Sequence, residues 1–161
     1  MDTIRFRHAH FSARFPVGLL YAPSHFWMLP EDGPAEGGRH AVWRVGFTKF
    51  ATRMLGELVE LVLEVPPGTM IRGGDRLGTV EGFKAVSDLF GVVDGTLRTA
   101  NPALRTESCL THSDPYGAGW LYAVEGLPAA GHLDVHGYIS LLQETIDRLQ
   151  ASRYSGADDG T

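Results

Sequence analysis

The sequence is short of several residue types, and each shortage excludes a class of protein. Cys109 is its only cysteine, so the chain cannot form an internal disulfide or a cysteine metal cluster. We expect Cys109 to be a small buried or half-buried apolar residue. No apolar run approaches the roughly 20 residues of a membrane span, and residues 1–15 lack the continuous apolar stretch of a secretion signal. We therefore expect no membrane insertion or secretion, and the cytoplasm is the expected compartment.

Positive charge is also scarce. The 161 residues include 14 basic and 19 acidic side chains, giving a net charge of -5. This balance lacks the basic excess that neutralises phosphates, so no nucleic acid partner is expected. Only Lys49 and Lys84 are lysines, and all other basic residues are arginines. The closest histidine pairs are His8 with His10 and His132 with His136; neither has a third ligand beside it, so we predict no metal site.

The pattern of apolar residues in the middle of the chain indicates strands. Residues 41–48 alternate apolar and polar side chains, as a half-buried strand requires. Residues 48–55 have the spacing of a short helix, with Thr48 as its N-cap and an apolar stripe formed by Phe50, Ala51, Met54 and Leu55. Residues 55–65 return to alternation and predict a second strand, with Glu60 and Glu64 on its outer face. The side chains predicted to point inward from this strand are Leu55, Val59, Leu61, Leu63 and Val65.

Glycine and proline divide the rest of the chain. Asp94-Gly95 is the strongest signal for a hairpin turn, and residues 119–126 read as a last strand. Asp134 can cap a C-terminal helix with an apolar stripe. Short strands with such punctuation predict a mainly β fold, a compact antiparallel sandwich or barrel. Residues 1–20 form an extension expected to add an edge strand, and residues 153–161 a frayed tail.

Lys84 lies between two strand-like runs in TVEGFKAVSDLFGVVDGTL, residues 79–97. If these runs face one another, the lysine lies near their connection and its amine is exposed on a stiff turn. A modifying enzyme could reach such an amine without unfolding the sheet. A catalytic lysine would instead need its pKa lowered by burial or by a neighbouring cation, and the nearby acids Glu81 and Asp88 act in the opposite direction.

Four ordered segments resemble the H-protein family of the glycine cleavage system, within the lipoyl/biotinyl-domain superfamily. YAPSHFW at 21–27 resembles YxPxHEW, and VGFTKFATRMLGEL at 45–58 resembles VGITDYAQxxLGDI. EGFKAVSDLFGVVDGTL at 81–97 resembles ESVKAASDLxxPVSGEV, and DPYGAGWL at 114–121 resembles DPYGxGWL. The resemblance implies a barrel-sandwich hybrid fold over residues 21–152. It also implies that Lys84 is the acceptor of a lipoyl group, accompanied by Glu81 and Asp88.

The resemblance further implies a non-catalytic carrier that moves an aminomethyl group between enzymes on its lipoyl arm. The implied partners are a pyridoxal-phosphate glycine decarboxylase, an aminomethyltransferase, a dihydrolipoamide dehydrogenase and a lipoate-attaching enzyme. Biotin is an alternative cofactor for this superfamily, but the biotin acceptor is typically flanked by methionines, and here the neighbours are Phe83 and Ala85. An unmodified interaction module and a lysine-based enzyme are the alternatives from other classes.

The chain departs from the family pattern at three positions. Phe26 replaces the acid of HEW, Lys49 replaces an aspartate, and Gly82 replaces the serine of ESVK. Loss of an acid and gain of a cation near the arm disfavour a cationic aminomethyl cargo, by about 1 kcal/mol for each partly exposed charge. These changes are consistent with an H-like lipoate-binding protein that serves another pathway, such as sulfur oxidation or lipoate relay.

His25, inside a matched motif, is expected to be structural or pocket-lining.

Overall fold

The computed structural model describes residues 2–159 of the protein. The N-terminal half contains β1 (Thr3–His8), β2 (Phe11–Pro16), β3 (Leu20–Tyr21), β4 (Phe26–Pro30), η1 (Glu36–Gly38), β5 (Ala41–Phe47), α1 (Lys49–Leu55), β6 (Leu58–Leu63) and β7 (Met70–Ile71). The C-terminal half contains β8 (Arg76–Gly82), β9 (Val86–Phe90), β10 (Val93–Ala100), η2 (Pro102–Arg105), α2 (Leu110–Ser113), β11 (Tyr122–Pro128) and α3 (Val135–Asp159).

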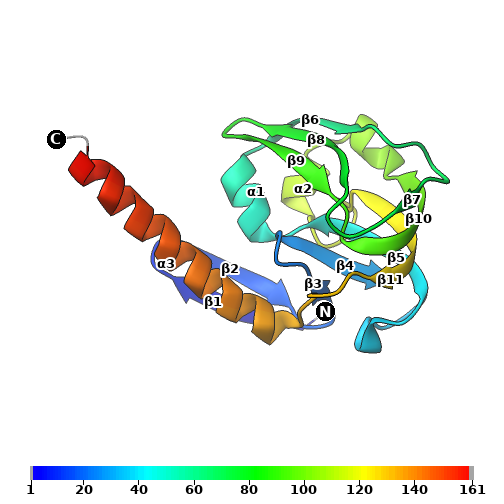
Figure 1. Ribbon diagram of the computed structural model, residues 1–161, viewed down its shortest axis with the longest axis horizontal. Coiled ribbons are helices and arrows are strands. Elements are labelled where there is room, and N and C mark those ends of the chain that lie inside the picture. Colours follow the sequence, from blue (N-terminus) through cyan, green and yellow to red (C-terminus); the bar gives the residue numbers. More distant parts are fainter. Residues whose placement is uncertain (1, 160–161) are drawn as a thin grey trace.

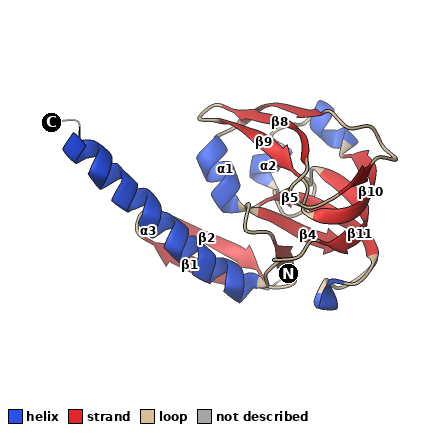
Figure 2. Ribbon diagram, viewed as in Figure 1, coloured by secondary structure: helices blue, strands red, loops and turns tan. Residues whose placement is uncertain are grey.

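Two antiparallel sheets enclose a common apolar core (Figure 2). One sheet has six strands in the order β3-β4-β5-β11-β10-β7, and the other has three in the order β6-β8-β9. Trp43 from β5 and Leu97 from β10 share the core with Val80 from β8 and Leu89 from β9, and all four side chains are buried. The predicted mainly β fold, with a short helix after a core strand and a C-terminal helix, is confirmed.

Helix α1 begins where the sequence predicted. The hydroxyl of Thr48 accepts a hydrogen bond from the backbone N–H of Ala51 at 3.3 Å, which satisfies one of the free donors at the start of the helix. Phe50 and Thr52 are its buried residues, whereas Met54, predicted to be part of the apolar stripe, is 47% exposed. The helix is too short to turn all of the predicted stripe towards the core.

The strand that follows α1 differs from its predicted form. It spans Leu58–Leu63 instead of residues 55–65, and the register shifts between Leu58 and Glu60. This bulge leaves Val59 without a cross-strand partner, and the side chain predicted to point inward is 51% exposed. The outward placement of Glu60 and Glu64 is confirmed.

The predicted hairpin turn at Asp94-Gly95 is wrong, because β10 runs without a break through both residues. Gly95 pairs with Gly126 of β11, and a Cβ atom on Gly95 would lie 2.0 Å from the carbonyl oxygen of Glu125. Glycine is therefore needed here for the close approach of two strands. Asp94 is also fixed within the fold, since its Oδ1 accepts a hydrogen bond from Gly73 N–H at 2.7 Å.

Two further expectations differ from the structure. Strand β11 starts at Tyr122 rather than near residue 119, because the side chain of Asn101 bonds the carbonyl oxygens of Ala118 and Trp120 and holds that segment outside the ladder. Cys109 is exposed rather than buried, because it precedes the four-residue helix α2, whose buried residue is Thr111.

The N-terminal extension does not add an edge strand to either large sheet. Strands β1 and β2 instead form a separate two-stranded hairpin that lies alongside α3 (Figure 1). Phe15 of β2 contacts Tyr138 of α3 edge-on, with ring centroids 5.5 Å apart, and Tyr138 stacks on Tyr21 at 4.7 Å. His8 bonds the Asp147 carboxylate at 2.7 Å. The hairpin packs on α3 instead of pairing with the edge of a large sheet because the aromatic cluster with α3 buries the apolar face of the hairpin.

Helix α3 starts as predicted but ends later. The Asp134 carboxylate accepts a hydrogen bond from Gly137 N–H at 2.8 Å. The sequence predicted a frayed tail over residues 153–161. The backbone remains helical through Asp159, because each added residue of an established helix gains one hydrogen bond, and residues 160–161 lie outside the described residues. Within the described residues, no helix combines the length and the apolar character needed to cross a membrane.

Trp27 supplies a test of the core. It is 1% exposed and its Nε1 donates to the carbonyl oxygen of Pro115 at 2.8 Å. A Cβ atom on Gly46 would lie 2.4 Å from its ring. We expect Gly46→Ala to lower the free energy of unfolding by about 2 kcal/mol through overpacking, measured by denaturant titration. Gly18→Ala is the control, since nothing lies within 4 Å of its added Cβ; equal stabilities of the two variants would contradict this packing.

Candidate functional site

Lys84 lies in the connection between β8 and β9, at one end of the three-stranded sheet. The last paired residues are Glu81 and Val86, and the N–H of Gly82 donates to the carbonyl oxygen of Ala85 at 2.9 Å. We call residues 82–85 the tip. The predicted position of Lys84 at an exposed turn between two strands is thereby observed.

The backbone of the tip is fixed to the junction between α1 and β6, residues 55–57. Lys84 N–H donates to the carbonyl oxygen of Leu55 at 2.9 Å, and Phe83 N–H donates to that of Glu57 at 3.0 Å. Gly82 makes this approach possible, since a Cβ atom there would lie 2.1 Å from the Leu55 oxygen. The departure from the family pattern at residue 82 thus has a structural consequence.

The side chain of Lys84 lies across Gly56. A Cβ atom on Gly56 would be 3.0 Å from Cγ of Lys84, and Gly56 has a φ of 76° and a ψ of -172°, a conformation that is essentially restricted to glycine. The Lys84 amine lies 3.4 Å from the carbonyl oxygen of Arg53 and forms no ion pair with the described residues. The backbone of this residue is therefore fixed while its amine is exposed.

The two acids predicted to accompany Lys84 lie on the flanking strands. Asp88 forms an ion pair with Arg76, with Oδ1 and Nε 3.1 Å apart, and Arg76 also binds Glu64 of the neighbouring segment. The hydrogen bond from Arg76 lowers the pKa of the Glu64 carboxyl below its usual value. Glu81 is exposed beside the tip. In the described part of the chain neither Glu81 nor Asp88 contacts the Lys84 amine, so their predicted roles stay predictions.

Two grooves flank the tip. The first, which we call the apolar groove, has a volume of about 410 Å³ and is lined by residues of α1 and β9 together with Ser24, His25 and Phe26. The second, the hairpin groove, has a volume of about 790 Å³ and lies between β2 on one side and residues of α1 and α2 on the other. Lys84 lines the hairpin groove and does not line the apolar groove.

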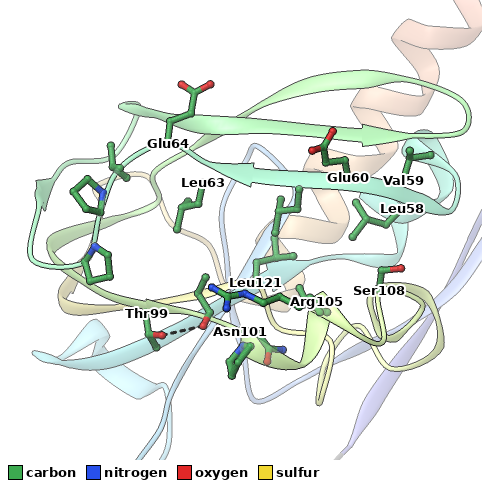
Figure 3. Close-up of a pocket in the computed structure, with 17 residues that line it drawn as sticks. Leu58, Val59, Glu60, Leu63, Glu64, Thr99, Asn101, Arg105, Ser108 and Leu121 are labelled. Carbon is green, nitrogen blue, oxygen red and sulfur yellow. Dashed lines mark hydrogen bonds between the residues drawn. The ribbon is translucent and has the colours of Figure 1, made fainter.

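A third groove, of about 740 Å³, lies between β6 and the segment from β10 to η2 (Figure 3). Leu63 points into it, whereas Glu60 and Glu64 point away from it on the other side of β6. Arg105 of η2 and Leu121 line the opposite wall. Lys84 does not line this groove, so its volume alone does not connect it with the exposed amine.

His25 joins the apolar groove to α3. It has a φ of 74°, and its Nδ1 lies 2.9 Å from the Tyr138 hydroxyl, which lies 2.8 Å from Oγ1 of Thr48. Burial lowers the pKa of His25 to about 4 and raises that of the Tyr138 hydroxyl. Both groups are therefore neutral at pH 7, and a consistent assignment has Thr48 donating to Tyr138 and Tyr138 donating to His25. This chain links α3 to the first turn of α1.

One histidine of each pair noted in the sequence, His8 and His132, forms a contact within the fold. His8 bonds Asp147, and His132 lies 3.0 Å from the carbonyl oxygen of Ala129. Among the side chains that the structure describes, no group of three or more from histidine, cysteine, aspartate or glutamate is placed to hold a metal ion.

Comparison with known proteins identifies the family. The family described as Glycine cleavage H-protein matches residues 19–134. The chain belongs to this family. The Glycine cleavage system H protein of Micrococcus luteus is 39% identical over 129 residues, covering 78% of this chain and 94% of that protein. The protein of the same name from Alcanivorax borkumensis is 38% identical over 140 residues, covering 86% and 95%.

A solved structure agrees with this assignment. The crystal structure of a glycine cleavage system H protein from Mycobacterium marinum superposes with a TM-score of 0.68 at 32% identity, covering 78% of this chain and 97% of that one. The family match includes the tip and both acids but begins after β2. The N-terminal hairpin is therefore outside the range that matches the H-protein family.

Sequence reasoning missed three parts of the site. It did not place Leu55 and Glu57 under the tip, did not pair Arg76 with Asp88, and did not place Arg14 of β2 in the groove that Lys84 lines. For the first of these features the sequence offered one signal: Gly56 directly follows a predicted helix, a position where a positive φ is common. The Arg76–Asp88 ion pair and the placement of Arg14 depend on contacts between segments that come together only in the folded chain.

Gly56→Ala should loosen the tip. The new methyl group would both strain the backbone and press on Lys84, so we expect faster hydrogen exchange of the Phe83 and Lys84 amides, measured by mass spectrometry of peptides across residues 82–86. Gly68→Ala is the matched control, because Gly68 also has a positive φ, 93°, but nothing lies within 4 Å of the added Cβ. Both variants should lose about 1–2 kcal/mol of stability; unchanged exchange in Gly56→Ala would refute the contact.

His25 should make stability depend on pH. Its pKa is about 4 in the folded protein and near 6.5 when unfolded, so below pH 6.5 the unfolded chain binds a proton that the folded chain does not. The free energy of unfolding should fall between pH 6.5 and 4, by up to about 3 kcal/mol from this residue. Denaturant titrations should show a smaller fall in His25→Asn, which tolerates a positive φ, than in the exposed-residue control His40→Asn.

Proposed function

We propose that the protein is a non-catalytic carrier of the glycine cleavage system, with a lipoyl group attached to Lys84. The observation that supports this most directly is an exposed amine on a turn whose backbone is bonded to Leu55 and Glu57. An attaching enzyme can approach such an amine without unfolding the sheet. Residues 21–152 would form the carrier unit, and residues 1–20 would be an addition to it.

A tethered cargo explains why the carrier needs no catalytic group of its own. When attached, the lipoyl group accepts and releases an aminomethyl cargo through its sulfur atoms. The chain holds the attachment point in a fixed place, so that the cargo meets successive enzymes at high effective concentration. The proposed partners are a pyridoxal-phosphate glycine decarboxylase, an aminomethyltransferase, a dihydrolipoamide dehydrogenase and a lipoate-attaching enzyme.

The surface around the tip suits brief contacts with these enzymes. Phe83 and Val86 are 76% and 70% exposed on either side of Lys84, and Met54 is exposed on α1 nearby. Exposed apolar side chains of this kind provide docking contacts, and the acidic Glu60 adds negative charge to the same end of β6. An exposed, unpaired Cys109 is compatible with a reducing compartment, so we propose the cytoplasm.

A second candidate is supported by the side chains of the two grooves. Phe26 is buried and stacks on Phe47, with ring centroids 5.6 Å apart, where the family pattern has an acid. Lys49 lines the hairpin groove, and Asp88 is already paired with Arg76. The loss of an acid at position 26, the cation at position 49 and the pairing of Asp88 each make the surroundings of the arm less favourable for a cationic cargo, which favours an H-like carrier in another pathway, such as sulfur oxidation or lipoate relay.

The lysines of the chain provide the decisive variants. We expect the protein, expressed with a lipoate-attaching enzyme, to gain the mass of one lipoyl group, and Lys84→Arg to gain none. Lys49→Arg is the control, because Lys49 is the only other lysine and is also exposed. Intact-mass measurement with peptide mapping gives the result.

An adduct that persists in Lys84→Arg would place the attachment elsewhere, and a bare wild-type chain would favour an unmodified interaction module. If the adduct is found, glycine-dependent reduction of the arm by the partner enzymes separates glycine cleavage from the second candidate. Reduction at a rate similar to that of a family member would exclude the other pathways as its sole role.

A further inference from the structure

The side chain of Lys84 already points along one of the two grooves at the tip. Its stem lies over Gly56 and its amine lies 3.4 Å from the carbonyl oxygen of Arg53, and both of these residues line the hairpin groove. Neither lines the apolar groove. A group attached to the amine would therefore begin its path on the floor of the hairpin groove.

The far wall of this groove is joined to α1 and α3 by side-chain contacts. It consists of β2, which pairs with β1 along its whole length. Phe11 of β2 contacts Phe50 of α1 edge-on at 5.5 Å, and the Arg53 guanidinium lies 5.6 Å from the centre of the Phe11 ring. His8 is bonded to Asp147 of α3. These contacts hold the hairpin against both helices, so the groove exists without a ligand.

The lining offers both apolar surface and positive charge. Phe11, Ala13 and Pro115 provide apolar contacts, and the cations Arg14, Lys49 and Arg53 line the same groove. Its two carboxylates are Glu57 and Asp114, and Asp114 already accepts a hydrogen bond from Ala118 N–H at 2.8 Å. An arm with an apolar chain and an uncharged or anionic end fits this lining better than one with a cationic end.

We propose that the lipoyl arm on Lys84 rests in the hairpin groove, between β2 and the residues of α1 and α2, rather than in the apolar groove. The proposal rests on the proposed attachment of lipoate to Lys84. It gives the N-terminal hairpin, which lies outside the range of the family match, a role as a wall that shelters the arm. The bound arm is in equilibrium with a free one, because partner enzymes must reach it.

Disulfide trapping on the lipoylated full chain tests the resting place. Each variant has Cys109→Ser and one new cysteine: Ser12→Cys or Ser113→Cys in the hairpin groove, Ser24→Cys in the apolar groove, or Ser140→Cys on α3. All four serines are exposed. The introduced thiolate attacks the S–S bond of the lipoyl ring, forming one new S–S bond and releasing the other sulfur as a thiolate, with no net oxidation.

The trapping rate is compared with the rate at which the same cysteine, in the unlipoylated protein, reacts with free lipoamide. This ratio is an effective concentration and corrects for the reactivity of each thiol, including the influence of Arg14 on its neighbour. We expect effective concentrations about tenfold higher at Ser12→Cys and Ser113→Cys than at Ser24→Cys and Ser140→Cys. Quenched samples are digested and the cross-linked peptides are measured by mass spectrometry.

A higher value at Ser24→Cys would assign the arm to the apolar groove, and equal values at all four positions would show a free arm; either result overturns the proposal. Arg14→Glu in the Ser113→Cys background should reduce trapping, whereas Arg105→Glu should not, because Arg105 is an exposed arginine that lines the groove beside β6 and does not line the hairpin groove. Intact mass is measured before trapping, so a failure of lipoylation is distinguished from an arm that rests elsewhere.

Discussion

The site depends on one close approach of backbone to backbone. The tip of the β8–β9 hairpin lies directly on the junction between α1 and β6, with Lys84 and Phe83 donating hydrogen bonds to Leu55 and Glu57. Gly82 and Gly56 permit this approach, since a side chain on either would collide with the opposing segment. A turn that would otherwise project freely from the end of a small sheet is thereby bonded to a helix.

In this arrangement the backbone of the tip is held in place while the side chain of Lys84 is free to move. The peptide groups of residues 83 and 84 are fixed, whereas the amine has one long contact, at 3.4 Å, and remains exposed. A flexible arm on a fixed point samples a limited volume around that point, which keeps its effective concentration high for any enzyme that docks nearby. The bulge at Val59 lies between the Leu58–Gly82 and Glu60–Glu81 pairs, next to the tip, and a bulge of this kind bends the strand that carries it.

Features that depend on neighbouring residues could be predicted from the sequence. The features that were not predicted depend on contacts between residues far apart in the sequence. The cap at Thr48, the alternation of residues 41–47 and the exposure of Lys84 follow from neighbouring residues, and all were predictable. Asp94-Gly95 has the local chemistry of a turn, yet Gly95 serves the approach of β11, which the local sequence does not show. The ion pair of Arg76 with Asp88 and the attachment of the hairpin to α3 likewise join segments whose alignment arises only in the folded chain.

The partnership of the N-terminal hairpin with α3 has a consequence for biosynthesis. The hairpin is synthesised before the two large sheets and α3 is synthesised after them, while the aromatic cluster that joins the hairpin to α3 needs both. Until the ribosome releases residues 135–159, the apolar face of the hairpin, including Phe6 and Phe15, has no helix to cover it. The sheets can fold as they emerge, but the far wall of the groove beside Lys84 takes its final position only after residues 135–159 have left the ribosome.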